Sequence, residues 1–306
     1  MKVTQLETTR NLLTDLEKLN RSFADVNRQL SSHKKLNTLS DSPFGSASLV
    51  NITEQALRLD TYRFNVINSS FQLKTAESAL NAVNNIFTSI NVLGMQAANE
   101  PIPTDGRKAI LNEIESLRDE LIARGNTQVE GRYIFAGSLV NVAPFELDII
   151  RNSAGEKTGE TFSYNGNDNV HSIPIGDGVE VVAGVSGQKA LGAVFDAVND
   201  LIAALETAIA NDNADGIGAA LEAFGSALSE LGAARGQIGA SLSMVERMSA
   251  MIDTRDGVLR EQRSNLEDAN IYEVAIRLGQ LQTAINAALS SGGAILQQNS
   301  LFDIIG

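Results

Sequence analysis

The 306-residue sequence has no cysteine and no tryptophan, and aromatic residues make up only 5% of it. Without cysteine the chain can form no disulfide, no zinc–thiolate site and no thiol nucleophile. Hydrophobic residues nevertheless reach 43%, so a core has to be built mainly from aliphatic side chains. That composition is typical of helical bundles and differs from that of an intrinsically disordered chain.

Positive charge and long apolar runs are also scarce. The chain carries 24 Lys and Arg against 37 Asp and Glu, a net charge of −13, which argues against a nucleic-acid partner because phosphates need a basic face. No apolar run approaches the roughly 18 residues of a membrane span, and the first residues, "MKVTQLETTRNLL", lack the apolar segment of a signal peptide. We therefore expect no membrane insertion, and either a cytoplasmic location or export without a cleaved signal.

Clusters with the pattern of a catalytic or metal site are missing as well. His33 and His171 are the two histidines and lie in different regions, so they do not suggest a metal site. The paired carboxylates at 119–120 and 267–268 fall on helical or capping positions, where a solvated surface is the better interpretation. "NGNDN" and "GDG" lack the ligand pattern of a calcium loop. The sequence thus predicts no enzyme, no cofactor and no metal; an enzyme would need one convergent polar cluster.

What the sequence does have is helical periodicity, first of all near its two ends. In two short patterns, apolar residues recur at spacings of 3, 4, 3 and 4, which predicts one apolar face per helix. These ten residues, called the terminal stripes below, are Leu16, Leu19, Phe23, Val26 and Leu30 in the first helix and Ile271, Val274, Leu278, Leu281 and Ile285 in the last. An isolated pair of short helices is marginal in water, so these stripes could order on assembly.

Between the ends, two seven-residue repeats predict long helices that pack as in a coiled coil. The first repeat, within 46–98, consists of Ile52, Leu59, Val66, Leu73, Leu80 and Phe87; the second consists of Ile238, Val245, Ile252, Leu259 and Leu266. A further helix is expected around 110–121, with Thr104 or Asp105 as its N-cap. The partner column of the first repeat contains polar residues, which favours a bundle seam over an isolated two-stranded zipper.

Residues 129–190 change the period, because short β-prone runs such as "VEVV" alternate with turn residues. The expected fold is therefore mainly α: a long antiparallel helical bundle or coiled coil built from both chain ends, with a small β-rich insertion at its tip. We divide the chain into a terminal helical coiled-coil domain (1–40 and 268–306), a helical bundle domain (41–140 and 191–267) and a β-rich outer domain (141–190).

Three stretches of the sequence give a family resemblance. "SSHKKLNTLSDSP" at 31–43, "GRYIFAGS" at 131–138 and the C-terminal stretch "SNLEDANIYEVAIRLGQLQTAINAAL" resemble the flagellin-like family, and most closely its hook–filament junction proteins. The motif positions are Asn37, Ser40, Asp41 and Pro43, and Gly131, Arg132, Tyr133, Ile134, Phe135 and Gly137. His33 stands where the family usually has glycine, and Ser42 where it usually has aspartate, so we expect a stiffer loop there.

The resemblance implies a structural, self-assembling component of the flagellum, extracellular and exported by the flagellar type III apparatus without a cleaved signal. Its implied partners are copies of itself in a ring, flagellin, the first hook–filament junction protein and an export chaperone. On the residues alone, intramolecular packing is the better interpretation of the terminal stripes; with the resemblance, an assembly interface becomes the better one.

Three alternative functions stay open: a minor flagellin, a type III secreted needle-tip or translocator protein, and an enzyme, which would need one convergent polar cluster. A minor flagellin would form the filament itself, and a type III secreted needle-tip or translocator protein would need a long apolar segment. Tyr133 and Phe135 either pack the bundle against the insertion, which we favour, or contact another subunit.

Overall fold

The computed structural model describes residues 2–38, 41–99, 102–151 and 157–297. It separates into two compact units, one made of Met1–Arg58 with Thr254–Gly306 and the other of Leu59–Asp253. Six helices and six strands lie in the described part of the chain, and the mainly α fold predicted from the sequence is confirmed. None of the helices described there combines the length and hydropathy of a membrane span.

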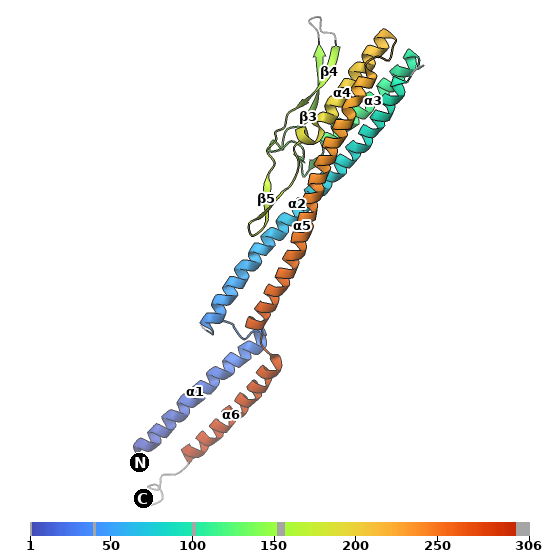
Figure 1. Ribbon diagram of the computed structural model, residues 1–306. Coiled ribbons are helices and arrows are strands. Elements are labelled where there is room, and N and C mark those ends of the chain that lie inside the picture. The colour runs from blue at the N-terminus through green and yellow to red at the C-terminus, as the bar shows by residue number, and fades with distance from the viewer. Residues whose placement is uncertain (1, 39–40, 100–101, 152–156, 298–306) are drawn as a thin grey trace, which may run out of the picture. The chain divides into compact units, whose positions relative to one another are not determined.

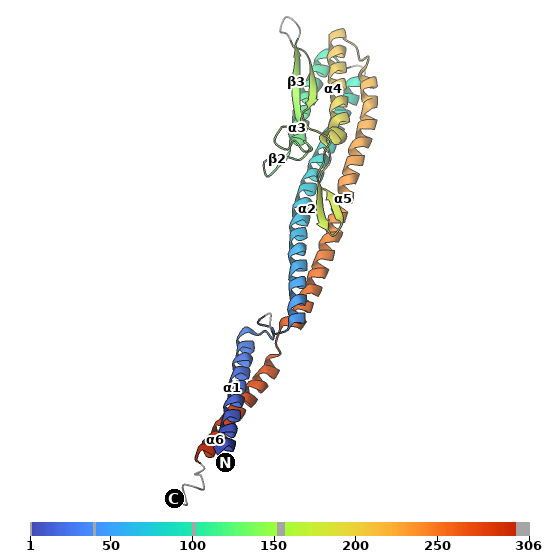
Figure 2. The same cartoon turned by 90° about the vertical axis from the view of Figure 1, so that its left-hand side faces the viewer.

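The smaller unit is built around the first and last helices, α1 (Lys2–Ser32) and α6 (Ile271–Gln297). The two helices lie against each other (Figures 1 and 2). Gly292 of α6 packs directly against α1, because a Cβ added there would lie 2.7 Å from Leu12 Cδ2. The unit also contains the first turns of α2 (Pro43–Ala98) and the last turns of α5 (Ile217–Glu267). Both predicted terminal helices are therefore present.

The larger unit contains most of α2 and α5 together with α3 (Thr104–Gly125) and α4 (Gly187–Asn211). The two seven-residue repeats are buried or half-buried along their whole length, as their spacing predicted. Phe87 of α2 stacks on Phe224 of α5 with ring centroids 4.4 Å apart. The core is otherwise aliphatic, and α4 contributes Leu191, Leu201 and Leu205, each at most 1% exposed.

The start of α3 differs from the prediction. Its N-cap is Pro103, and no side chain caps the helix there, so the assignment of Thr104 or Asp105 was wrong. Thr104 is instead the first helical residue, and its hydroxyl donates to the carboxylate of Asp212 in the α4–α5 connection. The Thr104 side chain thus forms a tertiary hydrogen bond to the α4–α5 connection and does not cap its own helix.

The β-rich insertion consists of three separate antiparallel hairpins in the order of the chain. They pair β1 (Gln128–Val129) with β2 (Arg132–Tyr133), β3 (Phe145–Arg151) with β4 (Lys157–Tyr164), and β5 (Ser172–Gly176) with β6 (Val179–Val182). The strands run along the side of the helices of this unit (Figures 1 and 2). The predicted β-rich region is thus confirmed.

Helix α4 and the β3–β4 hairpin share one core. The ring of Phe195 on α4 lies 4.4 Å from the ring of Phe145 and 4.5 Å from that of Phe162, measured between centroids. Arg118 of α3, with a side chain only 6% exposed, forms an ion pair with Glu160 of β4. The contacts therefore place the hairpin in the same compact unit as the helices, while the three-domain division drawn from the sequence stays a prediction.

Candidate assembly surfaces

The structure brings the two terminal stripes onto one helix pair. Val26 and Val274 are buried, at 4% and 7% exposure, while Ile271 is 37% exposed. The other seven stripe residues, Leu16, Leu19, Phe23, Leu30, Leu278, Leu281 and Ile285, are half-buried. Helix pairing thus covers the stripes only in part. Their role as an assembly interface stays a prediction.

Other apolar residues of the same two helices lie in solvent. Tyr272 is 84% exposed, Ile276 64%, Leu13 58% and Leu289 56%. Tyr272 and Ile276 are four residues apart on α6 and therefore share one helix face. This second apolar face was not predicted from the sequence, because the 3–4 spacing of the stripe indicates one apolar face for each helix. The i, i+4 spacing of Tyr272 and Ile276 would have predicted it.

Backbone hydrogen bonds join the chain at the C-terminal end of α1 to the chain at the C-terminal end of α5. The N–H of Lys35 donates to Glu267 O (2.7 Å), and the N–H of Ala269 donates to His33 O (2.9 Å). His33 has a φ of +59°, a left-handed conformation that costs a non-glycine residue about 1–2 kcal/mol. A glycine would adopt the same conformation without that cost.

An ion-pair cluster, called the linker clasp below, joins the same two linkers. The Glu267 carboxylate, with its side chain 13% exposed, accepts from Lys34 Nζ and from Arg263 Nε, the latter at 2.8 Å. The hydrogen bond from Lys34 is the main cause that lowers the pKa of Glu267, and the hydrogen bond to Glu267 raises the pKa of Arg263. Glu267 therefore stays ionised and holds two cations.

The motif residues of the α1–α2 linker form a local loop. Asp41 accepts backbone N–H bonds from Asn37 and Thr38, both at 2.8 Å, and a 2.6 Å bond from the Thr38 hydroxyl. These hydrogen bonds, with that of the Thr38 hydroxyl largest, lower the pKa of the exposed Asp41. Pro43 is the first residue of α2, and Ser40 lies outside the described residues. The motif thus fixes the entry into α2.

Helix α2 carries an exposed apolar face in the larger unit. Phe64 is 65% exposed, Ile67 59% and Phe71 58%, and we call these three residues the α2 outer stripe. Within the smaller unit, α2 also exposes Val50 (60%) and Leu57 (63%). The sequence contained the signal, because positions 50, 57, 64 and 71 form a second seven-residue column, which was overlooked beside the column that begins at Ile52.

The glycines of "GRYIFAGS" are turn residues. Gly131 and Gly137 have φ of +77° and +66°, which side chains rarely adopt. At Gly137 there is also no room, since an added Cβ would lie 2.0 Å from Asn167 O. The amide of Asn167 completes the contact by accepting from the Ser138 N–H at 2.9 Å. The motif therefore fastens the start of the insertion to a later loop.

The aromatic residues of the motif have different surroundings. Phe135 is fully buried, and its carbonyl oxygen accepts from Tyr164 Oη and from the Gly187 N–H, both at 2.9 Å. Tyr133 is half-buried, and its N–H donates to Val140 O at 2.9 Å. Phe135 thus agrees with the packing interpretation of this stretch.

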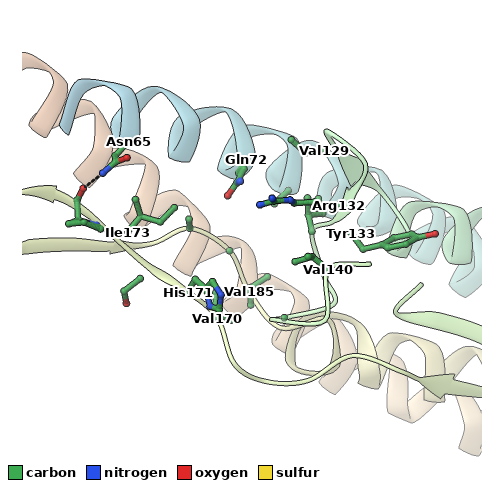
Figure 3. Close-up of a pocket in the computed structure, with 17 residues that line it drawn as sticks. Asn65, Gln72, Val129, Arg132, Tyr133, Val140, Val170, His171, Ile173 and Val185 are labelled. Atoms are coloured by element: carbon green, nitrogen blue, oxygen red, sulfur yellow. Dashed lines mark hydrogen bonds between the residues drawn. The ribbon is translucent and has the colours of Figure 1, made fainter. Parts of the chain in front are cut away.

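Arg132 and Ile134 of the same motif line a cleft of about 560 Å³ in the larger unit. Asn65 and Gln72 of α2 form one side, and the segments 170–174 and 183–185, including His171, form another (Figure 3). Asn65 Nδ2 donates to Pro174 O at 2.7 Å and so ties α2 to β5.

The carboxylates that could suggest catalysis have structural partners. Asp119 accepts from Arg118, and Glu120 pairs with Arg124 at 3.0 Å. Among the described residues, no group of three His, Asp or Glu side chains has the arrangement of a metal site.

Comparison with known proteins indicates the same family as the sequence motifs. The bacterial flagellin N-terminal helical region matches residues 3–139, and the bacterial flagellin C-terminal helical region matches residues 221–303. Flagellar hook-associated protein 3 of Escherichia coli is 25% identical over 202 residues, which cover 63% of this chain and 62% of that protein. The chain thus matches somewhat less than two thirds of this relative.

The chain is also similar to a flagellin over a shorter region and to a solved structure. Polar flagellin F of Vibrio parahaemolyticus is 31% identical over 138 residues, covering 44% of this chain and 35% of that protein. The crystal structure of flagellar hook-associated protein 3 from Legionella pneumophila superposes with a TM-score of 0.60 at 13% identity, covering 70% of this chain and 98% of that one. At this identity the superposition shows a shared fold.

Proposed function

Because the chain belongs to the flagellin family, we propose that it is a structural subunit of the bacterial flagellum that assembles with copies of itself at the junction between hook and filament. The observation that carries the proposal is the match to hook-associated protein 3, which extends over 63% of the chain, whereas the flagellin match covers 44%. The fold shared with the Legionella hook-associated protein supports it.

The surfaces of the two units suit a subunit that is covered on several sides. The smaller unit exposes Tyr272 and Ile276, and the larger unit exposes the α2 outer stripe. Burying one such side chain completely contributes about 1.5–3 kcal/mol, and these are already partly covered, so that range is an upper limit for each. Assembly would thus draw its free energy from apolar burial along helices.

The partners in this proposal follow from its place in the flagellum. Copies of the chain would form a ring, with the first hook–filament junction protein on one side and flagellin on the other. An export chaperone would bind the chain before export, and the extracellular location would be reached without cleavage of a signal. In this proposal the chain has no catalytic role; it works by holding its neighbours.

Deletion of the gene followed by electron microscopy tests the proposal. We expect intact hooks without filaments and flagellin released into the medium, and full recovery when the wild-type chain is supplied. Filaments of normal length on cells that lack the gene would contradict the junction role. If the purified chain itself grew into long filaments, the alternative of a minor flagellin would be favoured instead.

Complementation with variants then tests the surface. A Phe64→Asp, Phe71→Asp chain should be exported and folded, since exposed substitutions change stability by about 0.5 kcal/mol or less, yet it should leave hooks without filaments. Leu228→Asp is the matched control, because it places a carboxylate on an exposed leucine of α5, 46% exposed and outside the stripe. Equal recovery by both variants would exclude the α2 outer stripe from the interface.

A further inference from the structure

The cleft beside the "GRYIFAGS" hairpin has a charge opposite to that of the chain as a whole. Its lining includes Arg132 and His171 but no aspartate or glutamate, although the sequence holds 37 acidic against 24 basic residues. Arg132 supplies a cationic guanidinium. A net-negative molecule thus has a cleft that favours a negatively charged occupant.

Two polar side chains of the cleft are available to an incoming group. Within the described part of the chain, neither Arg132 nor Gln72 takes part in a side-chain hydrogen bond or ion pair, whereas Asn65 beside them donates to Pro174 O. Figure 3 shows Arg132 of the hairpin extending towards Gln72 of α2. A planar guanidinium binds a carboxylate with two parallel hydrogen bonds, and the amide of Gln72 can donate a third.

The rest of the lining requires an apolar group next to that carboxylate. Val129 and Val185 are buried at the cleft wall, and Ile134 and Ile173 are half-buried. A volume of about 560 Å³ lies within the range of roughly 300–1,000 Å³ of ordinary binding sites. It accommodates a few side chains of a protein segment. A single arginine is too little positive charge for a nucleic acid.

We propose that this cleft receives an acidic side chain and its apolar neighbour from a second copy of this chain. Each copy is strongly acidic, so the charges of cleft and partner are complementary. Asn65 and Gln72 follow Phe64 and Phe71 on α2 and lie about 100° around the helix from them, so a copy that covers the α2 outer stripe and extends around α2 reaches the rim of the cleft. The inference rests on the proposed self-assembly. It adds that this cleft determines how two neighbouring copies are aligned.

The absence of cysteine from the sequence makes a direct test possible, because Ser172→Cys introduces a unique thiol at an exposed position of the cleft lining. The full-length variant is expressed in cells that lack the wild-type gene, and a thiol-linked photoreactive group is activated on their assembled flagella. We expect an adduct of two copies of this chain, with the second attachment on a peptide that contains aspartate or glutamate. Ser78→Cys, an exposed position on α2 outside the cleft lining, is the matched control.

Charge reversal tests the role of Arg132. Arg132→Glu in the Ser172→Cys chain should lower the yield of the two-copy adduct at least about tenfold, in line with the loss of a close charge pair at an interface. Reversing the identified carboxylate to lysine in the same chain should restore it. Arg124→Glu, which reverses an exposed charge on α3 outside the cleft, should leave the yield unchanged.

Two outcomes overturn the inference while leaving the junction role intact. One is an adduct with flagellin or with another flagellar protein in place of a second copy. The other is an adduct whose yield does not respond to Arg132→Glu. Normal filaments on cells without the gene would instead contradict the junction role itself, so the two failures are distinguishable.

Discussion

The helix pair α1–α6 and the bundle around α4 bury their apolar side chains to different extents. In the bundle, Leu80, Leu121 and Leu201 have no measurable exposure. In the helix pair, only Val26 and Val274 of the ten stripe residues are buried, and neighbouring Tyr272 and Ile276 face solvent. Burial of apolar side chains supplies the main favourable free energy of folding. The core of the larger unit is therefore sufficient for us to expect that this unit is stable by itself. In the proposed assembly, the helix pair would gain its full burial when other subunits cover it.

The largest expected effect is on amide exchange in the purified full-length chain. Amides of α1 and α6 should exchange at least about 10³-fold faster than those of α4, because local openings of a weakly buried pair cost several kcal/mol less than opening the core. Hydrogen–deuterium exchange followed by mass spectrometry measures this. Equal protection of the peptides around Leu19 and Leu201 would show that the comparison is wrong.

Leu278→Asp should separate assembly from folding. A carboxylate in the half-buried stripe of α6 opposes its coverage by other subunits, so hooks should carry no filaments. The melting transition of the bundle, followed by circular dichroism, should move by no more than a few degrees. Leu201→Asp is the matched variant in the bundle, and it should abolish cooperative melting. A comparable collapse with Leu278→Asp would make the terminal stripe part of the main core.

Phe135→Ala should destabilise the larger unit by about 3–5 kcal/mol, the usual cost of removing a fully buried phenylalanine. Chemical unfolding monitored by circular dichroism gives the value. Leu139→Ala, four residues along and 44% exposed, serves as the control and should cost less than about 1 kcal/mol. A small effect of Phe135→Ala would show that the motif can leave the core without harming the helices.

The linker clasp should respond to pH. The pKa of Glu267 is lowered in the folded chain, so its contribution is fully present above its ordinary value near 4.5 and is lost as the pH falls through the lowered value. Exchange of the Lys35 and Ala269 amides should therefore accelerate in acid, after correction for intrinsic exchange. Asp41 also has a lowered pKa, so part of the pH response remains in Glu267→Gln. An unchanged pH profile in that variant would remove Glu267 from the clasp.

His33→Gly should produce the smallest change, a stabilisation of the linker by less than about 1 kcal/mol. Relief of the left-handed conformation, worth about 1–2 kcal/mol, is largely offset by the greater freedom of glycine in the unfolded chain. Slower exchange of the Ala269 amide would report it. His33→Ala retains a Cβ and should bring no gain, so an equal effect of both variants would rule out backbone strain as the cause.

Local patterns predicted the elements that depend on local physics. The columns through Leu73 and Ile252 are buried as expected, because a seven-residue repeat places its residues on one face whatever the partner is. The clasp between Lys34 and Glu267 could not be predicted, since those residues lie more than 200 positions apart. Thr104 was misassigned for the same reason, because a distant carboxylate binds its hydroxyl. The seven-residue column through Phe64 was visible in the sequence, but a repeat alone does not predict which of two columns is buried and which is exposed.

The smaller unit joins the two ends of the chain, and this has a consequence for the order of events during synthesis. A ribosome has completed all of Leu59–Asp253 before it reaches Ile271, where α6 begins. The larger unit, which is continuous in sequence, can thus fold while α1 still has no helix to pair with. Throughout that interval the apolar face of α1 is open to water and to any protein that recognises an amphipathic helix. Nascent chains stalled before and after α6 would bracket the moment at which that interval closes.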